Sequence, residues 1–514
     1  MLGTRFSSKL FLFLSKPFKR QGHPSSFTRK QNNMRSFSLV QKTGEVSNKT
    51  VVFHLEGALL RSTSLFPYFM LVAFEAGGLL RCLLLFLSYP LVWLVGEDQL
   101  GLRVMVFLCF FGIKKSTFRI GSSVLPKFFL EDVGWEGFAA VMSCGRKVAV
   151  SNLPRIMVEG FLKDYLGVDA VVARDVKSLS GYFSGLMDQN KENEILLGEF
   201  KRGDAVIGIV SHNKHVGQNF FPHCKEVYSV SEAEKSNWQV LPREKYPKPL
   251  IFHDGRLAFK PTPASCLAMV MWIPFGIFVC VIRITLGILL PFNTSAPILA
   301  FSGTRITLSI PQNSLNQNQE KPKSHMLYVC NHRTLVDPLH IAHALNKPVC
   351  AVTYSLSRFN ELITPIRTAR LTRDREKDRE TMEKLLRVSN LVVCPEGTTC
   401  REPYLLRFSP LFAELTDDIV PVALDVKASM FYGTTASGHK CLDPVFHYMN
   451  PNPSYFIKIL EHLPKSETCA GGKTRIEVAN NVQNKIANAL GFLCTSLTRK
   501  DKYMILAGNE GICH

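Results

Sequence analysis

Short apolar runs alternate with helical patterns from Leu327 onward, and this alternation constrains the fold more than any other feature of the chain. Strands are expected at residues 327–330, 348–353, 367–372, 391–394 and 419–426. Helices are expected near residues 338–345, 357–363, 375–388 and 402–415. This order predicts an α/β domain with a largely parallel sheet, in which ligands bind beyond the carboxyl ends of the strands.

The first of these strands leads into a candidate catalytic turn. His332 follows the strand, Asp337 comes five residues later, and Pro338 favours the start of a helix. We therefore expect a loop over residues 331–337, on which the two side chains can meet. A histidine beside a carboxylate is a general-base arrangement, because the carboxylate fixes the tautomer and favours the imidazolium. The alternative is a surface turn that holds both residues by chance.

Three blocks in the same order resemble the successive motifs of the glycerolipid acyltransferases. They are residues 331–338, 395–399 and 419–422, which read NHRTLVDP, PEGTT and IVPV. Two longer stretches, Cys394–Phe408 and Lys248–Leu257, are similar to the land-plant glycerol-3-phosphate acyltransferases of the cutin and suberin type. The resemblance implies a membrane-bound enzyme that uses acyl-CoA and glycerol-3-phosphate, and it suggests attack by the sn-2 hydroxyl.

The resemblance also implies roles for single residues. His332 is the base and Asp337 its orienting partner, and the alcohol attacks the thioester without a covalent enzyme intermediate. Arg373 is the favoured ligand of the substrate phosphate and Arg375 the second choice, since guanidinium groups bind phosphate in a bidentate manner. A solvated basic turn is the alternative for these two arginines, because Asp374 can pair with them locally.

Four further substrate-binding residues come from the later motifs. Glu396 can accept hydrogen bonds from the glycerol hydroxyls, and Gly397 permits a close backbone approach to the substrate next to Thr398. Pro421 matches the block thought to line the acyl-CoA channel. No cofactor or metal ion is expected at this site.

The N-terminal half resembles the haloacid-dehalogenase-type phosphatases at two predicted strands, Val51–Leu60 and Lys147–Ser151. His54 and Glu56 stand where that family has its nucleophile and general acid, and residues 205–225 contain no Asp or Glu to hold magnesium. We therefore predict a degenerate domain without phosphatase activity. A replacement metal site at His212, His215 and His223 is the less favoured alternative to solvated loop histidines.

The net charge of +19 with a mean hydropathy of +0.07 favours a membrane protein that handles anionic substrates. No nucleic-acid-binding motif is present, so no nucleic-acid partner is expected. Residues 65–113 are interpreted as a membrane hairpin or an in-plane anchor, with a buried helical pair as the alternative. The uncharged run 261–282, kinked at Pro274, is the best membrane segment, and Arg283 after it is expected to mark a membrane interface.

The predicted organisation has four parts. Residues 1–44 are a basic segment, either a mitochondrial transit peptide or a tail on an anionic membrane. Residues 45–240 form the degenerate domain, interrupted by membrane-associated helices, and residues 260–292 form a membrane segment. Residues 293–514 form the acyltransferase domain, including an amphipathic helix near 478–490 but no further chemistry. The scattered cysteines indicate reduced thiols facing the cytosol.

The function predicted from the sequence is acyl transfer from acyl-CoA to glycerol-3-phosphate by a multi-pass membrane protein of the endoplasmic reticulum, with the mitochondrion as the alternative location. Three other functions remain open at this point. They are a lysophospholipid acyltransferase, a bifunctional acyltransferase and phosphatase, and a non-enzymatic membrane scaffold.

Overall fold

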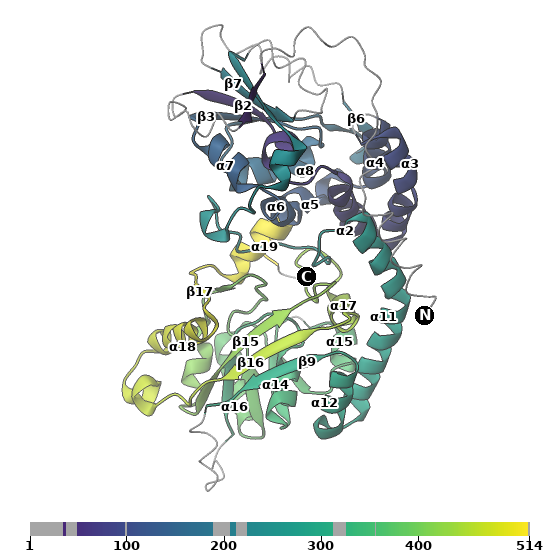
Figure 1. Cartoon of the computed structure of the whole chain (residues 1–514). Coiled ribbons are helices and arrows are strands. Elements are labelled where there is room, and N and C mark those ends of the chain that lie inside the picture. Colours follow the sequence, from purple (N-terminus) through teal and green to yellow (C-terminus); the bar gives the residue numbers. More distant parts are fainter. Residues whose placement is uncertain are drawn as a thin grey trace. The chain divides into compact units, whose positions relative to one another are not determined.

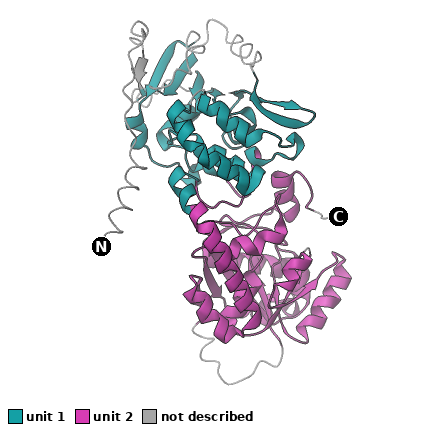
Figure 2. Ribbon diagram, turned by 90° about the vertical axis from the view of Figure 1, so that its right-hand side faces the viewer, with its two compact units in different colours: residues 1–121, 125–248, 261–268 teal, residues 122–124, 249–260, 269–514 magenta. Residues whose placement is uncertain are grey.

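A computed structural model of the chain divides into two compact units (Figure 2). Unit 1 comprises residues 1–121, 125–248 and 261–268, and unit 2 comprises residues 122–124, 249–260 and 269–514. The structure describes residues 34–37, 49–97, 100–188, 206–211, 224–311, 325–354 and 356–511. Most of the predicted basic segment 1–44, and also His212, His215 and His223, lie outside the described residues.

Unit 1 is built on a six-stranded sheet in the order β1-β8-β7-β2-β3-β4, and every neighbouring pair of strands is parallel. The strands are β1 (Met34–Ser36), β2 (Thr50–His54), β3 (Arg146–Val150), β4 (Ala170–Val172), β7 (Val206–Ser211) and β8 (Glu226–Val230). A separate antiparallel hairpin pairs β5 (Val176–Leu179) with β6 (Tyr182–Met187). The central strand β2 is buried over residues 51–54, as expected for a parallel strand covered on both faces.

The helices of unit 1 include the apolar segment for which a membrane insertion was predicted. They are α2 (Phe66–Leu87), α3 (Tyr89–Val95), α4 (Leu100–Phe110), α6 (Leu125–Leu130), α7 (Trp135–Met142), α8 (Arg155–Gly160) and α10 (Glu232–Ser236). The short helix α5 (Ile120–Ser123) contains residues of both units. Pro67 and Pro90 are the second residues of α2 and α3, where a proline has no helical hydrogen bond to lose. The helix α2 is broken at Gly78, whose φ is 71°.

Unit 2 is built on a seven-stranded sheet in the order β12-β11-β13-β10-β15-β16-β9. Figure 1 labels its strands β15, β16 and β9. The strands are β9 (Arg305–Ser309), β10 (Leu327–Cys330), β11 (Val349–Thr353), β12 (Arg367–Arg370), β13 (Asn390–Val393), β15 (Ile419–Lys427) and β16 (Ser454–Ile459). Only the β15–β16 pair is antiparallel. The prediction of an α/β fold with a largely parallel sheet is therefore confirmed.

The helices of unit 2 follow the strands in alternation. They are α14 (Asp337–Leu345), α15 (Arg358–Leu362), α16 (Arg375–Leu386), α17 (Asp443–Tyr448), α18 (Arg475–Leu490) and α19 (Arg499–Ala507). Val478, Val482 and Ile486 repeat at four-residue spacing on α18, and they are buried in one cluster with Leu327 of β10 and Ile419 of β15. This cluster forms the core beneath the sheet. The helix α18 starts earlier than predicted because Thr474 and Glu477 form a capping box.

The segment 263–301 forms α11 (Pro263–Leu289) and α12 (Phe292–Phe301). Arg283 on α11 was expected to mark a membrane interface, but its side chain is buried within unit 2. Its guanidinium donates to the carbonyl oxygens of Tyr448 at 2.7 Å and Asn450 at 2.6 Å. Because these donors need acceptors once water is removed, Arg283 fixes one face of α11 to the loop after α17.

The helix predicted near residues 402–415 is wrong. The segment contains β14 (Tyr404–Leu405), which pairs with β17 (Leu493–Cys494), and a 3₁₀ turn at Pro410–Glu414. Its backbone donors are used elsewhere, since the Leu406 amide donates to the Glu396 carboxylate and the Arg407 amide donates to the Leu497 carbonyl. Bonds of this kind depend on the tertiary fold, so the local sequence pattern could not show them.

Candidate active site

The His332 and Asp337 side chains meet at the carboxyl end of β10. The loop that leaves the sheet after Cys330 places His332 Nδ1 3.0 Å from Asp337 Oδ2. The helix α14 starts at Asp337 itself, one residue earlier than expected. When Nδ1 carries the proton that it donates to Asp337, Nε2 is the nitrogen that can accept a proton from a substrate.

The Asp337 carboxylate is buried and accepts further hydrogen bonds from its own loop. The backbone amides of Arg333 and Thr334 donate to Oδ2, and the Thr334 hydroxyl donates to Oδ1. The side-chain amide of Asn331 pairs with both backbone groups of Leu424 on β15, each at 2.8 Å. These bonds fix the loop at both ends, so the imidazole is held in one orientation.

The pKa of His332 reflects two opposing influences. Burial of the imidazole lowers it, but the neighbouring Cys394 thiol and the Asp337 carboxylate raise it, and the pKa lies above its usual range. Cys394 Sγ also lies 3.4 Å from Cys330 Sγ, on the adjacent strand. The contact with Cys330 and burial raise the pKa of the Cys394 thiol, which disfavours the thiolate that a nucleophile would need.

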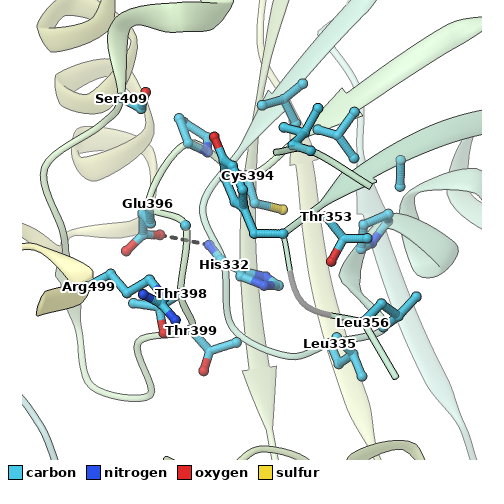
Figure 3. Close-up of a pocket in the computed structure, with 18 of the residues that line it drawn as sticks. His332, Leu335, Thr353, Leu356, Cys394, Glu396, Thr398, Thr399, Ser409 and Arg499 are labelled. Atoms are coloured by element: carbon cyan, nitrogen blue, oxygen red, sulfur yellow. Dashed lines mark hydrogen bonds between the residues drawn. The ribbon is translucent and has the colours of Figure 1, made fainter. Parts of the chain in front are cut away.

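Glu396 is a structural acceptor beside the histidine. Its Oε1 accepts the His332 backbone amide at 2.7 Å (Figure 3), and its Oε2 accepts the Leu406 amide at 3.0 Å. Burial raises the pKa of Glu396 to about 7. Gly397 follows with φ at 65°, a left-handed conformation that favours glycine. The predicted contact of Glu396 with glycerol hydroxyls therefore competes with two backbone amides.

Lys502 on α19 holds the same loop from the other side. Its buried Nζ lies 3.3 Å from Thr398 Oγ1, and it donates to the Thr399 carbonyl at 2.6 Å. Burial lowers the pKa of this lysine. Because no catalytic motif precedes it in the sequence, Lys502 was not singled out, and only the fold reveals that it supports the turn at residues 396–399.

A cavity of about 1010 Å³ opens beside His332 in unit 2. Glu396, Gly397 and Thr398 line it together with His332. Figure 3 shows Glu396 and Thr398 near His332. Apolar side chains form much of the remaining wall, including Leu335, Leu339, Leu356, Ile363 and Ile366. A volume of this size, with an apolar wall and a few polar groups, suits an elongated amphipathic ligand.

The two predicted phosphate-binding arginines are exposed and do not belong to the described residues that line the cavity. Arg373 has a φ of 70°, and its guanidinium lies 5.9 Å from the ring of Tyr354, which does line the cavity. The buried Asp378 carboxylate holds this turn by accepting the Arg373 amide at 2.9 Å. Arg375 instead forms an ion pair with Glu414 at 2.7 Å.

Pro421 also lies away from the cavity lining. It is buried in the middle of β15, where it pairs with Val329 of β10, and its carbonyl accepts the Leu460 amide. The structure thus brings His332, Asp337, Glu396, Gly397 and Thr398 together, and it leaves Arg373, Arg375 and Pro421 outside the cavity wall.

In unit 1, the residues that stand in the phosphatase positions bind one another. Glu56 Oε1 accepts the Ser151 hydroxyl at 2.6 Å and the backbone amides of Asn152 and Leu153. His54 Nδ1 lies 3.3 Å from Glu56 Oε2. A carboxylate therefore occupies the donors at the end of β3. Within the described residues, no group of three or more His, Cys, Asp or Glu side chains could hold a metal ion.

Two family models match the two halves of this architecture. A model described as "Glycerol-3-phosphate acyltransferase RAM2-like, HAD-like domain" matches residues 50–230, and an acyltransferase model matches residues 309–425. The fold and the matched models define an acyltransferase that carries an N-terminal haloacid-dehalogenase-like domain.

Similar proteins narrow this class to one family. The chain is 52% identical over 482 residues to "Probable glycerol-3-phosphate acyltransferase 2" of Arabidopsis thaliana, with 91% of each protein covered. It is 50% identical over 517 residues to "Probable glycerol-3-phosphate acyltransferase 3" of the same plant, covering 99% of this chain and 98% of the relative. "Glycerol-3-phosphate acyltransferase RAM2" of Petunia hybrida is 42% identical over 472 residues, with 89% and 97% covered. The chain belongs to the plant glycerol-3-phosphate acyltransferases.

Proposed function

We propose that this protein transfers the acyl group of an acyl-CoA to glycerol-3-phosphate and releases a lysophosphatidic acid that keeps its phosphate. The observation that carries this proposal is the contact of 3.0 Å between His332 and Asp337 beside the large cavity of unit 2. The names of the relatives support the same reaction, since three of them are called glycerol-3-phosphate acyltransferases.

The mechanism is direct attack of the acceptor hydroxyl on the thioester. His332 Nε2 accepts the hydroxyl proton while the oxygen forms a bond to the acyl carbon, and Asp337 stabilises the imidazolium. Collapse of the intermediate breaks the carbon–sulfur bond, and the proton passes to the departing thiolate to give free CoA. A positioned general base of this kind contributes about 10²–10⁴-fold to the rate.

The cavity wall supports the choice of an acyl donor with a long chain. Leu335, Leu339, Ile363 and Ile366 offer apolar surface on the same cavity as His332, and apolar surface gains about 25 cal/mol for each Å² removed from water. The resemblance to the cutin and suberin enzymes supports the sn-2 hydroxyl as the nucleophile and a role in the synthesis of extracellular polyester.

The haloacid-dehalogenase-like domain carries no phosphatase activity in this proposal. His54 replaces the attacking carboxylate, and the neighbouring Glu56 carboxylate is bound to Ser151 and two backbone amides. A phosphate would have to displace a buried, hydrogen-bonded carboxylate of the same charge sign. A bifunctional acyltransferase and phosphatase is thereby disfavoured.

The proposed enzyme acts at a membrane, most simply that of the endoplasmic reticulum, with its substrates in the cytosol. Two helices of the described part of the chain, α2 and α11, are long and apolar enough to cross a bilayer. Leu80 on α2 and Phe278 on α11 are among their exposed large apolar side chains. Exposed apolar surface of this extent favours contact with lipid.

The test is to incubate membranes that contain the protein with glycerol-3-phosphate and a panel of acyl-CoAs, and to identify the products by mass spectrometry. Lysophosphatidic acid as the product supports the proposal. Monoacylglycerol with release of phosphate would contradict the inactive phosphatase. Transfer only to a lysophospholipid acceptor would contradict the proposed substrate.

The matched variant for this test is His332→Ala. It should remove acyl transfer while the protein stays in the membrane fraction, since the residue lies on a loop. Retained turnover in this variant would rule out His332 as the base.

A further inference from the structure

The cavity beside His332 has a cationic wall that does not come from the acyltransferase motifs. Arg499 and Lys440 line it, whereas neither Arg373 nor Arg375 does among the described residues. Figure 3 shows Arg499 beside Thr398 and Thr399, on the same side of the pocket as Glu396. A phosphate held at this wall would lie close to the general base.

Tyr503 on α19 links the two cations. Lys440 Nζ donates to the Tyr503 hydroxyl at 3.1 Å, and the Arg499 guanidinium lies 4.8 Å from the centre of the same ring. Arg499 also donates to the backbone carbonyls of Glu510 and Gly511. Lys502 adds a third cation directly behind Thr398 and Thr399. The hydroxyl groups of these threonines provide further donors at the same place.

The loop that carries Lys440 is held in place by the segment after the N-terminal domain. Asp254 accepts hydrogen bonds from the hydroxyl groups of Thr435 and Ser437 and from the backbone amides of Ala436 and Ser437. Such a densely bonded loop positions a lysine with little freedom to reorganise.

The acidic groups near this wall are already bound to other partners. Asp443 forms an ion pair with Arg256 at 2.7 Å. Both oxygens of Glu396 accept backbone amides, and Asp501 caps its own helix through Thr498. Arg499 and Lys440 line the cavity with a guanidinium and an ammonium group, so an anion in the cavity would be attracted to this wall.

We propose that Arg499 and Lys440 form a phosphate-binding subsite of the cavity, supported by Tyr503 and Lys502. The inference rests on the proposed function for its choice of substrates. Glycerol-3-phosphate carries a phosphate group, and so does the CoA part of the donor. The cations of the subsite can bind the phosphate of either substrate. A guanidinium and an ammonium that both face one phosphate give charge-assisted hydrogen bonds.

The experiment compares Arg499→Gln and Lys440→Gln with Lys500→Gln in the full-length protein. Lys500 is the matched control, because it is exposed on the same helix and pairs with Glu510 outside the cavity. The two subsite variants should raise the KM of one phosphate-bearing substrate by about 10-fold, the effect expected for one lost charge-assisted bond. The control variant should keep both KM values.

The substrate whose KM rises identifies the phosphate. A higher KM for glycerol-3-phosphate alone assigns the subsite to the acceptor. A higher KM for acyl-CoA, with normal kinetics toward an acyl-pantetheine that lacks the CoA phosphates, assigns it to the donor. Unchanged KM values in both variants, or an equal change in the Lys500→Gln control, would overturn the proposal.

A binding measurement separates this inference from the proposed function. In the His332→Ala background, thermal protection by glycerol-3-phosphate or by CoA, compared with glycerol and pantetheine, reports phosphate binding without turnover. Protection that is lost in Lys440→Gln supports the subsite even when no acyl transfer is found. Equal protection with and without Lys440 and Arg499 would overturn it.

Discussion

In the proposed mechanism, the chemistry of His332 depends on Asp337, because the carboxylate contacts the imidazole and raises its pKa. The Asp337→Asn variant keeps the size of the side chain but removes its charge. It leaves one acceptor oxygen, where the carboxylate has two, for the donors of His332, Arg333 and Thr334. We expect kcat of Asp337→Asn to fall by about 10²–10⁴-fold. The measurement is the rate of lysophosphatidic acid formation.

The same variant makes a prediction for the pH dependence. The carboxylate raises the pKa of His332, so its removal lowers that pKa. Since the base acts in its neutral form, the acidic limb of the pH–rate profile should move to lower pH in Asp337→Asn. A limb that stays in place, or moves to higher pH, would contradict the assignment of His332 as the titrating base.

Asp254 offers a second prediction at the scale of one residue. Burial alone would raise the pKa of this carboxyl. The charge of Arg401 and the hydrogen bonds from Ser437 and Ala436 lower it by more than burial raises it, so the pKa lies well below its usual range. The ionised group therefore stabilises the fold above its unfolded pKa, and this stability is lost as the pH falls. Asp254→Asn should lower the stability by about 1–3 kcal/mol near pH 7.

Thermal unfolding of both proteins in detergent at several pH values measures this effect. The difference between wild type and Asp254→Asn should be constant from pH 7 to pH 5. It should shrink below about pH 4, where the Asp254 carboxyl of the unfolded chain takes up a proton that the folded protein does not bind. A difference that grows on acidification would show that the charge of Asp254 does not stabilise the loop.

At the scale of elements, the sequence predicts the strands and helices whose formation depends on a local pattern of apolar and polar residues. The strand at residues 327–330 was predicted with its observed bounds, because four apolar residues end at a polar turn. The segment at 402–415 was not, since its amides bind the Glu396 carboxylate and the Leu497 carbonyl across the fold. Local periodicity carries no information about such distant partners.

The residues of the candidate active site divide in the same way, into those that a local motif indicates and those that only the tertiary fold brings to the cavity. His332, Asp337 and the turn at 396–398 are close in sequence to strand ends, and their motifs could be read directly. Lys502 and Arg499 lie about a hundred residues beyond that turn, on a helix without a motif. Only the packing of the C-terminal segment brings α19 to the cavity, so no local pattern could indicate a role for these two cations.

The helix α18 permits a matched test of the core. Ile486 is fully buried in the cluster under the sheet, whereas Ile476 on the same helix is 57% exposed. Ile486→Ala should destabilise the protein by about 2–5 kcal/mol, through lost transfer energy and a cavity, and Ile476→Ala by less than about 0.5 kcal/mol. Thermal unfolding of both variants provides the comparison, and equal effects would contradict this account of the core.

At the scale of the whole molecule, the chain joins a haloacid-dehalogenase-like domain, for which we propose no phosphatase activity, to an acyltransferase domain with the candidate catalytic pair. In unit 1, Glu56 and Ser151 bind each other in the place of a phosphate site. In unit 2, the corresponding carboxyl edge of the sheet holds a histidine, a carboxylate and an open cavity. The two sheets are built by the same rules, so the difference in chemistry comes from a few side chains at their edges.

A membrane location makes a prediction about one face of α11. Met271, Phe275, Phe278 and Val281 are exposed at spacings of three and four residues, which places them on one side of the helix. Arg283 is buried on unit 2 through carbonyl acceptors. We expect a photoactivatable phospholipid in vesicles to label the exposed face of α11.

Other exposed apolar side chains serve as the internal control for this labelling. Val388 is 67% exposed and Leu493 is 64% exposed, but both lie in unit 2 outside the two helices that are long and apolar enough to cross a bilayer. Peptide mapping of the labelled protein should therefore find lipid adducts at Phe275 and Phe278 and few at Val388 or Leu493. Labelling of all four to the same degree would show that exposure alone governs contact. No labelling of α11 would mean that this helix faces water or another protein instead of lipid.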